Sequence, residues 1–208
     1  NATPNTEGAG IWQSGGGLAA DASGSVYFVT GDGTFTANAG GIDYGDSITK
    51  LGPTGAVLDY FTPYDQAAID ASGQDLCAAG VILLPDQPGA HPHLLIASGK
   101  NATVYLIDRD QMGHFNPNNN SNAVQTLPNI FPNGSEPIPG NFITSVYFNG
   151  TVYFSPTQDT IQAFRLGNGL LPSSPTSRSS QSFAFPGLPL AISANGSTNG
   201  VLWALERK

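Results

Sequence analysis

Three side chains suited to catalysis or ligand binding stand at related places in this sequence. Asp32 lies in the loop TGDG, Lys100 lies in the loop SGKN, and Asp75 shortly precedes the apolar run VILLP. Carboxylates with nearby carbonyls suit a hard cation such as calcium, and a lysine ammonium suits an anionic ligand. Asp-Gly is also ordinary turn chemistry and a single lysine is usually solvated, so the elements that carry these residues must show whether they meet.

The stretch Leu94–Gly113 indicates what those elements are. It contains two runs of β-branched, aromatic and other apolar residues, Leu94–Ser98 and Thr103–Asp108, joined by a short polar loop. This pattern predicts an antiparallel strand pair. Similar pairs recur within Ser25–Gly55 and Thr151–Gly169, and a copy cut short recurs at Gly200–Leu205. A repeated unit built only from strands is typical of propeller blades.

We therefore expect an all-β fold, a β-propeller segment of four-stranded antiparallel blades. The predicted blades cover residues 15–62, 80–128 and 142–186, and 189–208 begins a fourth. Between the first two, Thr62–Ala79 is interpreted as a connection, and NPNNNSN at Asn116–Asn122 as a loop. In the third blade, Ser173–Ser180 is expected to be a loop and Gln181–Phe185 the outer strand.

This blade pattern predicts where the three polar side chains lie. Antiparallel strands alternate in direction, so the loops after second strands share a face with the connections between blades. Asp32 and Lys100 occupy equivalent loops of neighbouring blades, and Asp75 lies in the connection between those blades. We expect the two carboxylates and the ammonium to converge on one face near the propeller axis.

The same segments carry a family resemblance. The runs GSVYFVTGDGTF, ITKLGPTGAVLDYFTP, QDLCAAGVILL and LLIASGKNATVYLIDRDQMG resemble the repeats of pyrroloquinoline-quinone (PQQ) type propellers. The likeness covers nearly the whole chain. It is closest to secreted PQQ-like repeat proteins and more distant to quinoprotein alcohol dehydrogenases.

The more distant resemblance implies roles for the three residues. In those dehydrogenases a GTGN-like motif supplies a calcium ligand, and VTGD places Asp32 there. The catalytic base matches Asp75, and the lysine that contacts the quinone matches Lys100. Calcium and PQQ are the cofactors so implied. This sequence departs from the pattern, because Gln74 replaces the tryptophan beside the base, and SGGGL, with Trp12 offset by several residues, occupies the place of the quinone-stacking tryptophan.

Composition excludes some partners and suggests a location. The 208 residues carry 15 acids and 7 bases, and this net charge of −8 argues against a nucleic-acid partner. No run is long and apolar enough to span a membrane. Low charge and several N-x-Ser/Thr sequons predict a secreted glycoprotein, or an extracytoplasmic bacterial protein without glycans. The candidate acceptors are Asn1, Asn101, Asn119, Asn133, Asn149 and Asn195.

Other chemistries have less support in the sequence. His91 and His93 stand two apart in HPH, but the strand count places them, with His114, on the face opposite Asp32, and no further ligand spacing completes a metal set. The chain has no G-x-S-x-G motif for a hydrolase. Cys77 is the only cysteine, so an internal disulfide is excluded and a buried thiol is expected.

The sequence therefore predicts a secreted PQQ-like propeller that acts as a non-catalytic module for binding or structure, with a protein or a glycan as partner. One alternative is part of a calcium- and PQQ-dependent alcohol or sugar dehydrogenase. Because a closed ring typically needs more blades, we expect further blades from the same chain or another one. A half-propeller unit of an extracellular assembly is the remaining alternative.

Overall fold

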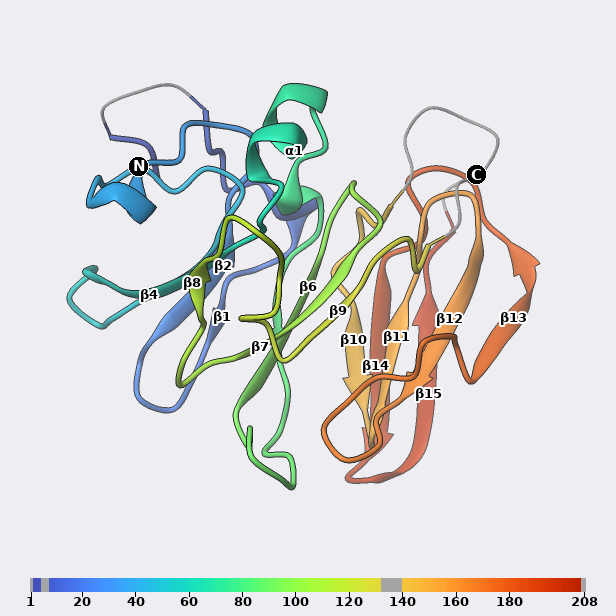
Figure 1. Cartoon of the computed structure of the whole chain (residues 1–208). Coiled ribbons are helices and arrows are strands. Elements are labelled where there is room, and N and C mark those ends of the chain that lie inside the picture. The colour runs from blue at the N-terminus through green and yellow to red at the C-terminus, as the bar shows by residue number, and fades with distance from the viewer. Residues whose placement is uncertain (1, 5–7, 132–139, 207–208) are drawn as a thin grey trace.

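The computed structural model describes residues 2–4, 8–131 and 140–206, and these form an all-β structure with one α-helix (Figure 1). The helix α1 spans Gln66–Ser72, and short 3₁₀ turns occur at Gln13–Gly15, Ala37–Ala39 and Leu76–Ala78. The strands are β1 (Ala19–Ala20), β2 (Val26–Val29), β3 (Ile48–Leu51), β4 (Val57–Thr62), β5 (Ile82–Leu83), β6 (Leu94–Ser98), β7 (Val104–Asp108), β8 (His114–Phe115), β9 (Gln125–Leu127), β10 (Val146–Phe148), β11 (Thr151–Phe154), β12 (Thr160–Arg165), β13 (Ser177–Ser182), β14 (Leu190–Asn195) and β15 (Thr198–Ala204).

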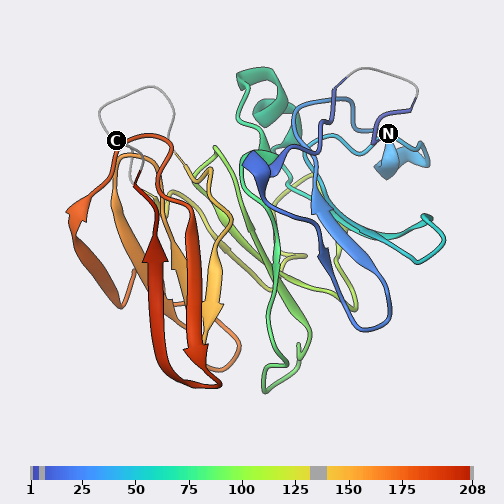
Figure 2. The ribbon, with the colours of Figure 1, turned by 180° about the vertical axis from the view of Figure 1, so that it is seen from behind.

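The strands form four separate open sheets; the first three follow one another in chain order across the molecule, and the last hairpin packs behind the third in the view of Figure 1 (Figures 1 and 2). The first sheet has the order β1-β2-β3-β4-β8, the second β5-β6-β7-β9, the third β10-β11-β12-β13, and the fourth is the hairpin β14-β15. Strands adjacent in each sheet are antiparallel except for β4 and β8. The prediction of an all-β chain with several antiparallel four-stranded sheets is confirmed.

The second sheet is buried on both faces, which explains its nearly uninterrupted apolar runs. Leu95 and Tyr105 belong to a core cluster shared with the first sheet, whereas Leu94 and Leu106 belong to a cluster shared with the third sheet. Successive side chains of a strand point to opposite faces, so one strand contributes to both cores. This packing holds the loop after β6, which carries Lys100, against the loops of the first sheet.

Two connections differ from the sequence interpretation. The segment Thr62–Ala79 contains α1. This helix has only seven residues, which is too few for an apolar periodicity to indicate it. Residues just before the expected Asn-rich loop form β8, which pairs in parallel with β4, so the first sheet has five strands rather than four. The His114 ring stacks on Tyr60 with ring centroids 4.7 Å apart. This contact joins the segment after β7 to the first sheet.

The outer strand of the third sheet was also predicted wrongly. The strand is Ser177–Ser182, so part of the expected Ser-rich loop is strand and most of Gln181–Phe185 is not. Most of this strand is exposed at a sheet edge, where serine hydroxyls need no apolar contacts. The Ser179 hydroxyl even accepts a hydrogen bond from the backbone N–H of Ile161 at 2.9 Å.

Candidate functional site

The structure brings Asp32, Asp75 and Lys100 together, as the strand count predicted. Lys100 Nζ forms an ion pair with Asp75 Oδ2 and donates to the carbonyl of Gly73 at 3.2 Å. The backbone N–H of Asp32 donates to Asp75 Oδ1 at 3.2 Å. Both partners of the ion pair are largely buried, with side chains 20% and 14% exposed. The two loops and the connection between the first and second sheets therefore meet at one place.

Glycines in the two loops allow this close approach. A Cβ on Gly31 would lie 2.5 Å from Asp75 Oδ1 and 2.8 Å from Cys77 Sγ. A Cβ on Gly99 would lie 2.6 Å from the carbonyl oxygen of Leu76. Each loop thus has a glycine just before its polar residue because the connection passes directly over the backbone there.

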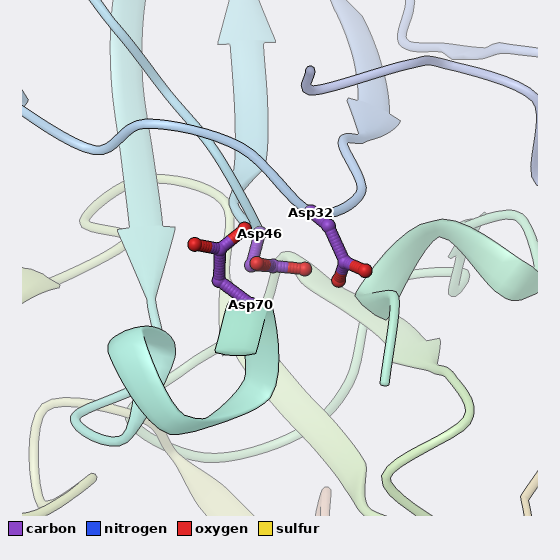
Figure 3. Close-up of side chains that lie close together, drawn as sticks. All are labelled: Asp32, Asp46 and Asp70. Carbon is purple, nitrogen blue, oxygen red and sulfur yellow. The ribbon is translucent and has the colours of Figure 1, made fainter. Parts of the chain in front are cut away.

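Two further carboxylates, which the sequence interpretation missed, complete an acidic cluster. Oxygen atoms of Asp32, Asp46 and Asp70 all lie within 4.8 Å of one another (Figure 3). Asp46 directly precedes the buried Ser47 and β3, and Asp70 lies on α1. An acid at the entry to a buried strand is a weak signal for Asp46. No sequence signal placed Asp70, because it depends on the unpredicted helix.

Burial governs the electrostatics of this cluster. Asp46 is fully buried, and desolvation raises its pKa to about 7. The N–H of Leu76 and the amide of Gln66 donate to its carboxylate at 3.2 and 3.4 Å and partly oppose that rise. The pKa of Asp32 is raised to about 6, first by burial and then by the charges of Asp75 and Asp70, while Lys100 opposes the rise. The charges of Asp32 and Asp46 are therefore not fully compensated by neighbouring positive groups.

The donor set fits a hard cation. Asp32 Oδ1 is buried, and no hydrogen-bond donor reaches it within the described ranges. Three carboxylates from a loop, a strand entry and a helix converge there with the oxygen chemistry that calcium prefers. The calcium role implied for Asp32 is thus compatible with its surroundings. The structure adds Asp46 and Asp70 as the residues that would share the ion.

A quinone fits the same region less well. The ammonium of Lys100 already contacts the Asp75 carboxylate and the Gly73 carbonyl. Lys100 and Asp75 would therefore have to break their ion pair to bind a cofactor. Trp12 is offset in sequence by several residues from the position of the quinone-stacking tryptophan, but in the fold it lies beside Lys100. Its ring centroid is 5.4 Å from Lys100 Nζ, within cation–π range.

The histidines make local pairs instead of joining this site. His91 Nδ1 lies 2.7 Å from Asp108 Oδ2, and His93 Nδ1 lies 2.7 Å from Asp110 Oδ2. His114 Nε2 lies 3.0 Å from Asp59 Oδ1. Within the described part of the chain, the only potential metal-binding group of three or more acid, histidine or cysteine side chains is the aspartate cluster.

Cys77 is fully buried in the first core cluster, next to the connection that carries Asp75. Burial raises the pKa of its thiol to about 12, which keeps the sulfur protonated at physiological pH. The expectation of a buried thiol is confirmed.

The sequons differ in accessibility. Asn119, Asn149 and Asn195 are exposed, so an oligosaccharyltransferase could reach them in the folded chain. Asn101 is half-buried, and its amide donates to the Tyr105 hydroxyl at 2.8 Å. Asn1 and Asn133 lie outside the described residues. Glycosylation itself stays a prediction.

No family model and no curated protein matches the chain. In the described residues, none of the helices has the length and apolar character needed to cross a membrane.

Proposed function

We propose that this chain is a segment of a PQQ-like β-propeller, and that it serves as an extracellular binding module that takes a hard divalent cation at its acidic cluster. The successive packing of open antiparallel sheets supports the blade interpretation. The sequence resemblance supports the PQQ-like assignment, and the low charge and accessible sequons support secretion.

The observation that carries the cation proposal is the convergence of the Asp32, Asp46 and Asp70 carboxylates, together with an Asp32 oxygen that is buried and has no donor among the described residues. Burial, and then repulsion between neighbouring carboxylates, raises the pKa values of Asp32 and Asp46. A divalent cation would replace the repulsion with attraction to all three. Bound there, it would tie the TGDG loop, the entry of β3 and α1 into one rigid face.

Calcium titration of chelator-treated protein tests the proposal. We expect calcium to raise the Tm saturably, because an ion that binds only the folded chain shifts the equilibrium toward folding. Asp70→Asn should weaken calcium binding at least about tenfold in isothermal titration calorimetry. Asp70 is exposed, so this substitution leaves the core intact.

Asp86→Asn is the matched control. Asp86 is 80% exposed and lies outside the cluster, so the variant removes the same charge without touching the site. It should bind calcium as the unmodified protein does. Absence of a saturable calcium effect, or equal losses in the two variants, would contradict the cation site.

Trp12 beside Lys100 is the single observation that favours the second candidate, part of a quinoprotein dehydrogenase. In that case PQQ would supply the redox chemistry, and Lys100, Trp12 and Asp75 would hold and orient it. Titration with PQQ plus calcium, followed by quenching of tryptophan fluorescence, tests this directly. Saturable quenching that Lys100→Met abolishes would support the candidate. Unchanged fluorescence would remove it.

A further inference from the structure

A cavity with several charged side chains in its wall lies between the first and second sheets, away from the acidic cluster. Asp32 follows the end of β2, whereas Asp21–Ser25 precede the start of the same strand, so the two sites lie at opposite ends of the sheet. The cavity has a volume of about 550 Å³. Its wall includes Asp21, Tyr27, Lys50, Asp86, His93, Arg109 and Asp110.

Arg109 is the unusual member of this wall. Its residue is only 9% exposed, and its Nε–H is buried with no acceptor in the described chain. Its nearest carboxylate is loosely placed, with Nη1 4.0 Å from Asp21 Oδ2. An arginine carries five donors, and a buried donor left without a partner costs free energy. The guanidinium also contacts the Tyr27 hydroxyl, so its unused hydrogen-bonding capacity within the described chain is the Nε–H.

Asp21 does not use this capacity because other groups already satisfy it. Its Oδ1 accepts hydrogen bonds from the N–H and hydroxyl of Ser23 and from the N–H of Ser25, at 2.9, 2.6 and 3.1 Å. The Tyr27 hydroxyl donates to Oδ2 at 2.8 Å. These donors outweigh desolvation and lower the pKa of Asp21 to about 2. Asp21 is therefore a saturated carboxylate that orients Tyr27.

Lys50 adds a second cation to the same wall. Its Nζ donates to the carbonyl oxygen of Arg109 at 2.8 Å and lies 5.6 Å from the centre of the Tyr27 ring. An ammonium has three donors, so two remain for a ligand. Two of the seven basic residues of this acidic chain thus meet at one cavity.

The acids at the rim are engaged elsewhere. Asp110 pairs with His93 Nδ1 at 2.7 Å, and Asp86 lies 3.8 Å from His93 Nε2. Both are mostly exposed, at 57% and 80%, so water screens their charge. Asp21 also keeps its negative charge, because its own hydrogen bonds stabilise it. These three acids would repel a ligand that carries more than one negative charge.

We propose that this cavity binds a small monoanionic carboxylate, held by the guanidinium of Arg109 and the ammonium of Lys50. The planar carboxylate matches the geometry of the guanidinium donors. The wall carries two cations and three acids, so a ligand with a single negative charge meets less repulsion there than one with more. The ligand would bridge the first sheet, through Lys50, and the loop after β7, through Arg109.

Acetate at constant ionic strength, with chloride as the replaced anion, is the probe. The side-chain Nε–H resonance of Arg109 reports the contact by NMR, because acetate bound to the guanidinium would change the shielding of this proton. We expect a saturable shift of this resonance and a matching rise in Tm. Sulfate at the same ionic strength separates a carboxylate site from a general anion site.

Lys50→Met keeps the aliphatic stem and removes the charge. It should weaken acetate binding at least about fivefold while the chain remains folded. Arg178→Gln is the matched control, because it removes an exposed cation that pairs with Asp159 on another sheet. It should leave acetate binding unchanged. Equal effects of acetate, sulfate and chloride, or unchanged acetate affinity in Lys50→Met, would overturn the proposal.

Discussion

A single buried carboxylate, Asp46, summarises the chemistry of the acidic cluster. It is fully buried, it accepts a backbone hydrogen bond from Leu76, and its pKa is nevertheless raised to about 7. The hydrogen bond fixes the orientation of the carboxylate, whereas burial penalises its charge. Ionising this carboxylate at neutral pH therefore costs free energy of folding. A bound cation would remove that cost.

This cost predicts a pH dependence of stability. The pKa of Asp46 rises from 3.8 to about 7, and that of Asp32 from 3.8 to about 6, so the folded chain holds these protons more tightly than the unfolded chain does. The free energy of unfolding therefore falls as pH rises from 4.5 to 7.5. Without calcium, we expect Tm to fall by about 4 °C or more across this range.

Asp46→Asn and added calcium should each flatten that slope. The asparagine keeps a neutral side chain of similar shape, and calcium stabilises the ionised carboxylates. Differential scanning calorimetry at matched ionic strength measures both effects. A slope that Asp46→Asn leaves unaltered would show that other groups cause the pH dependence.

The ion pair of Asp75 and Lys100 should be stronger than an ordinary surface pair. Its side chains are 14% and 20% exposed, and each makes a further hydrogen bond. A double-mutant cycle with Asp75→Asn and Lys100→Met should give a coupling of about 1–2 kcal/mol in urea unfolding.

The pair of Asp159 and Arg178 is the reference for this cycle. These side chains lie 3.4 Å apart, and Arg178 is 40% exposed. The same analysis there should give a coupling below about 1 kcal/mol. Equal coupling energies in the two cycles would mean that burial of the Asp75 pair adds nothing.

The helix α1 is the element on which the cluster depends most. It has only two turns, and it brings Asp70 to the cluster and Gln66 to Asp46. Gly73 ends it in the left-handed region at φ 67°, and its N–H donates to the carbonyl of Asp70 at 3.2 Å. A glycine is favoured here because other residues pay for this backbone conformation.

Gly73→Ala should therefore cost about 1 kcal/mol of stability and weaken calcium binding as well. The new Cβ meets only Asp32 Oδ2, at 3.8 Å, so the cost comes from the backbone and not from a clash. Urea unfolding and calorimetry measure the two effects. Gly55→Ala is the control, since Gly55 has φ 83° in an open turn far along the sheet. The Gly55→Ala variant should lose similar stability and keep its calcium affinity. Equal calcium affinities in the two variants would show that the end of α1 does not affect the cation site.

At the scale of the whole molecule, the series of packed sheets has two uncovered ends. The outer face of the first sheet forms an apolar groove of about 840 Å³, lined in part by Leu18, Phe28 and Val57. On the last hairpin, Val201 and Trp203 are about half exposed. Apolar surface of this extent commonly marks an interface with another part of a protein or with another chain.

The 208-residue chain should consequently associate as its concentration rises. Sedimentation velocity measures this, and the double variant Leu18→Ser with Trp203→Ser should associate at least about fivefold more weakly, because less apolar area is buried. Both side chains are more than half exposed, so folding should be little affected. A chain that stays monodisperse and monomeric at every concentration would contradict this prediction and the assembly alternative.

Much of the secondary structure could be predicted because it depends on local patterns. Alternating and continuous apolar runs identified the strand pairs, and Asn149-Gly150, both at positive φ, forms the predicted tight turn between β10 and β11. The short helix α1 and the edge strand β13 were missed, since neither has a periodic apolar face. Their conformations depend on what packs beside them.

For the candidate site, the alternation of strand directions along the sequence is enough to place Asp32, Asp75 and Lys100 on one face. That inference needs only chain order. The approach of Asp46 and Asp70 could not be deduced, because it depends on how α1 folds back over the first sheet. The same holds for Arg109 and Lys50. Their shared cavity exists because two sheets pack with a particular offset, and such packing is set by side-chain volumes across the whole core, not by local sequence.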